Sequence, residues 1–392
     1  MQSERCGYDR TRSLLRGIHA DFDNVKGSSV APSELAVITT RTEVMGALSE
    51  VSFGIRVPPS RTELAPNRLR DMAISAEHSG LDSLWLPDRL TTVDGYLKFL
   101  DGGAVVEPLT GLAYIAGITR RIRLGTGVLI GPLRHPLMLA KIISSLQALA
   151  GDRVVIGIGA GWNTAEMASL GIDFQRRGAL TDEVIAALGA LSDEGGISFN
   201  GQYFTFENVR LVPPLLSCPV LVAGGAGTSK FQRVGDAHFG PRVLKRIARS
   251  GGWFTRPTSS TVQISEGIAA IQDYANRESI ELASDFTVAH ANWCHLVDGD
   301  ADQAQREQRS VFAQMLGDEL SFDEMRPLHW TGTLSDVRAR VEQAVESGVT
   351  EVIASPLVAG SEQVDLWVNG VLAPLGYIAN RSGQVNKGSA DD

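Results

Sequence analysis

The sequence predicts one large α/β domain of the (β/α)8 barrel class, in which parallel strands alternate with helices. Short strand-like apolar runs alternate with helical segments eight times over about 330 residues, which suits a barrel of this class. The chain has 392 residues, and its 43% apolar and 21% charged content is that of an ordinary globular protein. A doubly wound open sheet is the alternative, because the order of strands in a sheet cannot be read from a sequence.

The predicted strands are short apolar runs bounded by turn residues. They cover residues 52–57, 81–86, 122–130, 153–159, 219–225, 252–256, 286–293 and 350–356. A small hairpin is expected at 197–206, with its turn at Asn200–Gly201. Together with extra residues after the fifth and seventh strands, it makes three insertions into the barrel, after strands 4, 5 and 7.

The predicted helices lie between these strands and carry recognisable end signals. Pro66 suits a first helical turn and Gly80 a C-terminal cap, while Thr333 and Asp336 have the spacing of an N-terminal capping pair. Glu107 and His135 each precede a proline at a helix start, where a structural role is the simpler interpretation. The helices cover 66–80, 108–119, 136–151, 181–191, 241–251, 265–275, 301–319, 332–348 and 363–376.

The two ends of the chain differ in composition from the middle. Residues 1–50 are polar, rich in Arg and Ser and without periodicity, so a disordered extension is expected there. The barrel domain is expected over 51–380, and 381–392 as a solvated, disordered tail.

Charge and cysteine usage limit the classes of partner. A net charge of -9 argues against a nucleic-acid surface, and no apolar run is long enough to span a bilayer. The three cysteines have no C-x-x-C spacing, which favours a reducing cytoplasm without disulfides or zinc. His290, Cys294 and His295 lack an evident fourth ligand, so no metal site is expected.

Glycines end several predicted strands, and residues 154–163 read VVIGIGAGWN. A dinucleotide fingerprint G-x-G-x-x-G fails here because, counted from Gly157, Trp162 holds the third glycine position. No phosphate-binding G-x-x-x-x-G-K-[ST] motif exists. In a barrel, the glycines at the ends of strands three, four and five would lie together on the C-terminal rim, where active sites form. They therefore suggest a flat ligand lying against that rim.

Several longer segments carry a family resemblance. They are GLDSLWLPDRL, IRLGTGVLIGPLRHPLMLAKIISSLQAL, DRVVIGIGAGWNTAEMASLGIDFQRRGALTDE and ISFNGQYFTFENVRLVP, with looser matches in GGWF and GTLSDVRARVEQAVESGV. In these segments, which cover most of 51–376, the chain resembles the bacterial-luciferase-like oxidoreductases, above all their F420-dependent branch.

The resemblance implies a barrel that binds coenzyme F420, or FMN as the alternative, on its C-terminal rim. It implies a bulge, often with a non-proline cis peptide, at Thr126, Gly127 and Val128 behind the cofactor ring. Ala160, Gly161 and Trp162 would line the ring. The cofactor phosphate would lie by the fifth strand end, with candidate ligands Gly224, Gly225, Gly227, Thr228, Ser229, Lys230 and Arg256, although the extra residues 228–240 beside it depart from the family pattern.

The candidate catalytic residues also depart from part of that family. Its sugar-phosphate dehydrogenases carry a His after the second strand and a Glu after the fourth, where this chain has Arg89 and Trp162. Arg cannot act as a base at neutral pH, so sugar dehydrogenation is disfavoured. Arg89 would instead anchor an anion or polarise a carbonyl, or pair with Asp88, and His290 is a candidate hydrogen-bonding residue.

The expected activity is F420H2-dependent reduction of an activated C=C or C=O group in a small organic or natural-product substrate. The first alternative is a two-component monooxygenase that uses FMNH2 and O2 and receives its reduced flavin from a separate reductase. A separate flavin or F420 reductase is therefore the expected protein partner. A non-catalytic flavin-binding partner subunit is the second alternative. A homodimer is the expected assembly, as in many members of the family.

Overall fold

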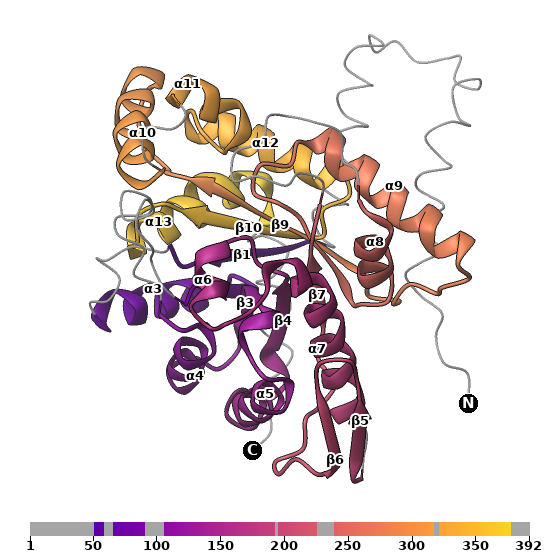
Figure 1. Ribbon diagram of the computed structural model, residues 1–392. Helices are drawn as coiled ribbons and strands as arrows, with labels where there is room; N and C mark the ends of the chain where they lie inside the picture. Colours follow the sequence, from indigo (N-terminus) through magenta and orange to yellow (C-terminus); the bar gives the residue numbers. More distant parts are fainter. Residues whose placement is uncertain are drawn as a thin grey trace, which may run out of the picture.

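The computed structural model describes residues 51–58, 66–90, 106–192, 195–225, 239–316 and 321–377. Within them, eight parallel strands close a barrel in the order β1-β10-β9-β8-β7-β4-β3-β2 (Figure 1). The closed ring confirms the predicted barrel and rules out the doubly wound sheet. The expectations for residues 1–50 and 381–392 lie outside the described residues.

All eight barrel strands fall on the predicted runs. They are β1 (Ser52–Arg56), β2 (Ser83–Leu86), β3 (Arg123–Ile130), β4 (Val154–Gly159), β7 (Val220–Ala223), β8 (Gly252–Phe254), β9 (Thr287–Cys294) and β10 (Glu351–Pro356). The first and last strands pair in parallel, with Ile55 opposite Ala354, and this pairing closes the ring. Because the strands are parallel, all of their carboxyl ends lie on one rim.

The helices surround the barrel and begin and end close to their expected positions. Thr333 and Asp336 form the predicted capping pair, with Thr333 Oγ1 accepting from the Asp336 amide at 3.3 Å. The helices are α3 (Pro66–His78), α4 (Pro108–Ile118), α5 (Pro136–Ala150), α6 (Thr164–Ala168), α7 (Arg177–Leu191), α8 (Pro241–Ala248), α9 (Thr261–Arg277), α10 (Ala301–Leu316), α11 (Phe322–Met325), α12 (Leu334–Glu346) and α13 (Ser361–Asp365), which continues as a π-helix over Leu366–Leu372.

Two of the three predicted insertions lie in the described residues. The first, after β4, holds α6, α7 and the hairpin β5 (Ile197–Asn200) and β6 (Thr205–Val209), which extends beyond the barrel beside α7 (Figure 1). The hairpin turns over residues 201–204 rather than at Asn200–Gly201, since the Gly201 amide donates to the Phe204 carbonyl at 2.9 Å. The insertion after β9 holds α10 and α11. Most of the insertion after the fifth barrel strand, 226–238, lies outside the described residues.

The described residues form one apolar core inside the ring, one between the ring and the helices, and a small third cluster at Phe312, Phe322, Met325 and Leu357. Most of the buried apolar side chains lie between the strands and the helices. The ring interior holds a small cluster, whose buried members are Trp85, Val155, Leu221, Phe254, Ala289, Ala291 and Ile353. The interior is therefore filled by side chains, as in other barrels of this class.

A polar network closes the amino-terminal end of the barrel. Glu351, at the start of β10, is 1% exposed and pairs with Arg123 at 2.6 Å. Ser83 donates a hydrogen bond to the same carboxylate and accepts one from Trp85 Nε1 at 2.7 Å. This network holds the Trp85 indole inside the ring and leaves the carboxyl-terminal rim as the open end. None of the described helices is both long and apolar enough to cross a membrane.

Candidate active site

The third strand bulges at the carboxyl-terminal rim. The pairing of β3 with β4 shifts register between Thr126 and Leu129, and the Gly127–Val128 peptide bond is cis. The bulge expected at these residues is therefore present. A Cβ on Gly127 would lie 3.4 Å from Phe254 Cζ, 3.5 Å from Arg56 Cδ and 3.6 Å from Trp85 Cβ. The bulge thus faces the middle of the barrel mouth, among two aromatic side chains and one arginine.

The glycines of β4 make room for this bulge. A Cβ on Gly157 would lie 2.2 Å from the carbonyl oxygen of Thr126, and one on Gly159 would lie 3.2 Å from Val128. Gly161 has a φ of +74°, and a side chain there would meet Ile130 and Met167 at 2.7 Å. Gly157 and Gly161 are therefore required by protein packing, whether or not a ligand also lies on the rim.

Arg89 and Trp162, from loops after β2 and β4, are brought together at the rim. The Arg89 Cζ lies 5.3 Å from the centroid of the Trp162 ring, a cation–π distance, and the Trp162 side chain remains 46% exposed. Buried Glu166 connects the two loops, because its Oε1 accepts from the Leu90 amide at 2.6 Å. This connection was not expected from the sequence.

Asp88 pairs with Arg134, and not with Arg89 as the sequence suggested. Its carboxylate binds Arg134 at 2.5 Å and accepts from the Ile130 amide at 2.8 Å. Arg134 also pairs with Glu107 at 2.8 Å. Glu107 caps α4 and His135 caps α5, which confirms the structural roles expected for both. Asp88 therefore fixes the loop after β2, and the Arg89 side chain turns to Trp162 instead.

His290 lies outside the ring interior. On β9, the neighbouring Ala289 and Ala291 belong to the interior cluster, so His290 faces the helical layer. Asn292 Nδ2 donates to His290 Nε2 at 3.2 Å, which leaves Nδ1–H of the neutral ring to donate to Thr255 Oγ1 at 2.6 Å. Burial lowers the pKa of His290 to about 4. The structure thus separates His290 from Arg89 and Trp162 and gives it hydrogen-bond partners in the protein.

The candidate phosphate ligands are only partly described. Gly227 and Thr228 lie outside the described residues, as do Ser229 and Lys230. Gly225 approaches Arg256 from the next strand, since a Cβ on Gly225 would lie 3.3 Å from Arg256 Cδ. Gly224 packs against α8, where its Cβ would meet Val243 at 2.6 Å. Ala160 follows β4 and lies half-buried on the rim.

Sequence reasoning missed Arg56. This residue ends β1 and places its guanidinium at the barrel mouth, where Nη1 donates to the Gly127 carbonyl at 3.3 Å. The sequence does carry a signal for this residue, because a charged side chain is unusual in an apolar run such as SFGIRV. Side chains alternate along a strand, so Arg56 lies on the same face as Gly54. Within the part of the chain that the structure describes, no group of three His, Cys, Asp or Glu side chains has the geometry of a metal site.

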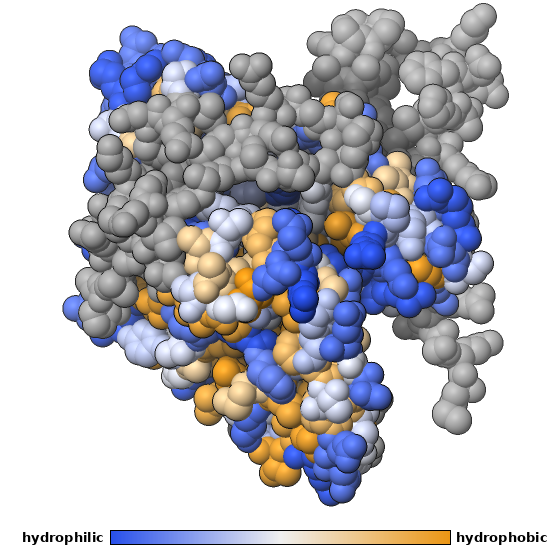
Figure 2. All heavy atoms as spheres, viewed as in Figure 1, coloured by the Kyte–Doolittle hydropathy of each residue, from blue (hydrophilic) through white to orange (hydrophobic). Residues whose placement is uncertain are grey.

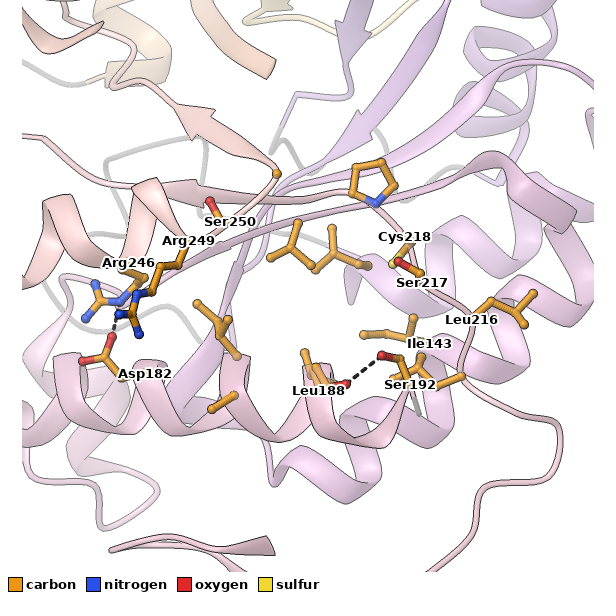
Figure 3. Close-up of a pocket in the computed structure, with 18 of the residues that line it drawn as sticks. Ile143, Asp182, Leu188, Ser192, Leu216, Ser217, Cys218, Arg246, Arg249 and Ser250 are labelled. Atoms are coloured by element: carbon orange, nitrogen blue, oxygen red, sulfur yellow. Dashed lines mark hydrogen bonds and ion pairs between the residues drawn. The ribbon is translucent and has the colours of Figure 1, made fainter. Parts of the chain in front are cut away.

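A separate cavity of ≈ 1000 Å³ is lined by none of the rim residues described above (Figure 3). It lies outside the barrel, between α7, the 215–220 segment and α8, and reaches the amino-terminal ends of β7 and β8 at Val220 and Gly251. Arg246 and Asp182 form an ion pair of 2.6 Å across it. Because its lining includes the amino-terminal ends of strands and none of the rim residues, it does not belong to the candidate active site.

The fold and this rim define a parallel α/β barrel with a bulged third strand at its open end. The family model for luciferase-like monooxygenases matches residues 49–351. The chain therefore belongs to the luciferase-like monooxygenase family, a family of oxidoreductases.

The similar proteins carry names of two different activities, F420-dependent dehydrogenase and monooxygenase. An F420-dependent glucose-6-phosphate dehydrogenase from Kineococcus radiotolerans is 33% identical over 186 residues, which are 46% of this chain and 53% of that protein. The monooxygenase RslO1 from Streptomyces bottropensis has a TM-score of 0.67 at 21% identity, covering 82% of this chain and 99% of its own.

An F420-dependent secondary alcohol dehydrogenase, solved with an F420-acetone adduct, has a TM-score of 0.67 at 17% identity, covering 82% of this chain and 98% of its own. The chain spans 53–62% of the length of the first curated relatives it matches. These structures share the fold with the present chain, and the fold alone does not separate reduction from oxygenation.

Proposed function

We propose that the chain is an F420-dependent oxidoreductase that uses F420H2 to reduce an activated C=C or C=O group of a small organic or natural-product substrate. The observation that carries this proposal is the pairing of Arg89 with Trp162 at the rim, 5.3 Å apart, in place of an acid–base pair. A permanent cation beside an exposed indole can orient a polar substrate but cannot take up a proton. Reduction of an already polarised group needs less proton transfer from the protein than sugar oxidation does.

The residues of the barrel mouth fit a flat ring. Phe254 is 4% exposed and contacts Trp85 edge-to-face, with 5.5 Å between ring centroids, so the floor of the mouth is aromatic. Val128 and Ala223 are only partly buried above this floor and offer small apolar contacts. When bound, F420 supplies or accepts a hydride, and these side chains would hold its ring and exclude water.

The polar end of the cofactor would bind near Gly225 and Arg256. Arg256 is half-buried, and burial lowers the pKa of its guanidinium from the ordinary value. A guanidinium next to a glycine backbone at a late strand end is a suitable phosphate ligand in a barrel. Gly224 completes the proposed phosphate side, and the further candidates Gly227 and Thr228 lie outside the described residues.

The alternative is a two-component monooxygenase that receives FMNH2 from a separate reductase and uses O2. A monooxygenase and an F420-dependent dehydrogenase resemble this fold equally well, with TM-scores of 0.67 each. Oxygen chemistry also does not require the proton-transfer pair that Arg89 and Trp162 replace. A non-catalytic flavin-binding subunit stays the lesser alternative.

Spectral titration of the purified protein with F420 and with FMN tests the proposal. We expect micromolar binding of F420 and at least tenfold weaker binding of FMN, a difference of about 1.4 kcal/mol. Micromolar binding of FMN without binding of F420 would transfer the proposal to the monooxygenase. Binding of neither cofactor would leave the family fold without the proposed chemistry.

The same titration on Trp162→Ala tests the wall that the indole is proposed to form. We expect affinity for the bound cofactor to fall by about tenfold, since stacking adds to the area that the indole buries. Tyr114→Ala is a matched control, because Tyr114 on α4 is 44% exposed against 46% for Trp162 and lies away from the rim. Equal affinities of wild type and Trp162→Ala would remove this role.

A homodimer is proposed on the exposed face of α5. Met138, Ile142 and Leu149 recur at helical spacing on this face and are 60%, 39% and 67% exposed. Figure 2 shows apolar residues gathered at the lower end of the molecule, over α5 and the hairpin. Buried in a dimer, such a patch would be removed from water. Sedimentation should give a dimer that Leu149→Lys dissociates, whereas a monomeric wild type would end the proposal.

The proposed location is the cytoplasm. Cys218 and Cys294 are free thiols, which suits a reducing compartment. The proposed partners are a small-molecule substrate and the separate reductase that regenerates the reduced cofactor.

A further inference from the structure

Two polar side chains stand on neighbouring strands at the mouth of the barrel, at positions for which the sequence predicted no function. Arg56 ends β1 and stands opposite Trp85 of β2. Ser355 stands opposite Trp293 of β9. Because Ile55 pairs with Ala354, Arg56 and Ser355 follow at the next position of adjacent strands. Alternation from Ile353, a member of the interior cluster, puts Ser355 on the inner face.

Both side chains have a buried polar atom without a hydrogen-bond partner in the described part of the chain. These atoms are Arg56 Nε and Ser355 Oγ. The Ser355 residue is 2% exposed, and the one described hydrogen bond of Arg56 runs from Nη1 to the Gly127 carbonyl at 3.3 Å. Buried polar atoms are normally paired, so two orphans on adjacent strands mark a place where a partner is missing.

The charge of Arg56 is also uncompensated among the described residues, none of whose carboxylates pairs with it. The titratable group that acts on Arg56 is Cys294, whose thiol stays neutral because burial raises its pKa to about 12. Burial lowers the pKa of Arg56 to about 10, so the guanidinium keeps its charge at neutral pH. A half-buried cation without a paired carboxylate favours binding of an anion.

The surroundings of this pair restrict the shape of the ligand. Trp85, Phe254 and Arg56 all approach Gly127. A Cβ added at Gly127 would lie within 3.6 Å of an atom of each of these side chains. Trp293 flanks Ser355 on β9. A ligand that reaches Arg56 and Ser355 therefore passes aromatic side chains, which suits a planar apolar molecule carrying one oxyanion.

We propose that Arg56 and Ser355 form an oxyanion-binding site at the barrel mouth, which takes a carboxylate or enolate-type oxygen of a planar organic molecule. The oxygen belongs either to the substrate or to the ring of the cofactor. Only this choice of source rests on the proposed function; the site itself does not. Arg56 donates from its guanidinium, and Ser355 Oγ–H donates the second hydrogen bond to the same oxygen.

Calorimetric titration of the cofactor-free full chain tests the site, with benzoate as the probe and benzamide as its neutral isostere. We expect wild type to bind benzoate more tightly than benzamide. Arg56→Gln should abolish this preference, and Ser355→Ala should weaken benzoate binding by about tenfold, the usual effect of losing a hydrogen bond to a charged group. Arg210→Gln, which removes an exposed arginine on the hairpin arm, should leave both affinities unchanged.

Titration of the same variants with F420 and FMN identifies the source of the oxygen. Benzoate preference with unchanged cofactor affinity in the variants assigns it to the substrate. If wild type shows no preference for benzoate, and Arg56→Gln and Ser355→Ala each bind the cofactor about tenfold more weakly or worse, the oxygen belongs to the cofactor ring. Selective benzoate binding by a wild type that binds neither cofactor would end the proposed function but keep this site.

The site is refuted if folded Arg56→Gln and Ser355→Ala bind all four compounds as wild type does. Circular dichroism establishes folding. Should Arg56→Gln not fold, Ser355→Ala decides by the same criterion, since it preserves most of the packing at the mouth.

Discussion

Gly157→Ala is expected to destabilise the chain by about 3 kcal/mol or more, the upper range for overpacking a core. The added methyl would lie 2.2 Å from the Thr126 carbonyl oxygen and 2.9 Å from Val128 Cγ1. The Thr126 side chain is itself held to the Gly157 carbonyl by a hydrogen bond of 2.8 Å. Because the obstacle is backbone within a closed barrel, it cannot move aside as a flexible side chain would.

Urea unfolding followed by circular dichroism measures this effect. Gly189→Ala is the matched control, because Gly189 lies in α7 and an added Cβ would meet nothing within 4 Å. Alanine there should be neutral or stabilise by up to about 1 kcal/mol, since glycine is a poor helix former. The free energy of unfolding of Gly157→Ala could instead lie within about 0.5 kcal/mol of the wild-type value, the ordinary range for surface substitutions. In that case the close approach of the bulge to β4 is wrong.

The free energy of unfolding should fall as the pH is lowered from about 6.5 to about 4, by about 3 kcal/mol through His290 alone. Burial lowers the folded-state pKa of His290 to about 4 and that of His329 to about 3. In this range the unfolded chain binds protons that the folded chain does not, so acid favours unfolding. Stability is retained above the unfolded pKa and lost below it.

The two histidines are linked through Asn292, whose side chain bonds His290 Nε2 at 3.2 Å and His329 Nδ1 at 3.1 Å. The charges of His290 and Arg340 lower the pKa of His329 further, after burial, the largest cause. Protonating either ring would disrupt this neutral network. Because the pKa of His329 in the folded chain is about 3, the free energy of unfolding continues to decrease as the pH falls toward 3.

Urea unfolding at a series of pH values tests the linkage. His290→Gln should lessen the pH slope between pH 6 and 4.5 by up to one proton. Exposed His78, at the end of α3, supplies the control, and His78→Gln should keep the wild-type slope. Parallel curves for His290→Gln and wild type would mean that His290 is not held neutral in the folded state.

The order of strands and helices was readable from the sequence because it depends on local pattern. Each apolar run such as VVIGIG is confined to one strand, and each helix end signal, such as Thr333 with Asp336, acts within one turn. The bulge at Thr126, Gly127 and Val128 was also expected, since its segment resembles a family in which that feature recurs. The pairing of Arg89 with Trp162 was not, because it joins loops that are distant along the chain.

The sequence by itself determined the barrel class, its strands and the rim on which a ligand would lie. Tertiary structure decided what the rim residues do. VVIGIGAGWN suggested glycines cleared for a ligand, whereas Gly157 is cleared for the Thr126 carbonyl of the neighbouring strand. Arg56 stood unremarked in an apolar run, and only closure of β1 against β10 brings it beside Ser355. The close approach of Gly157 to Thr126 and the missing partner of the half-buried Arg56 both arise between strands, so no local pattern records them.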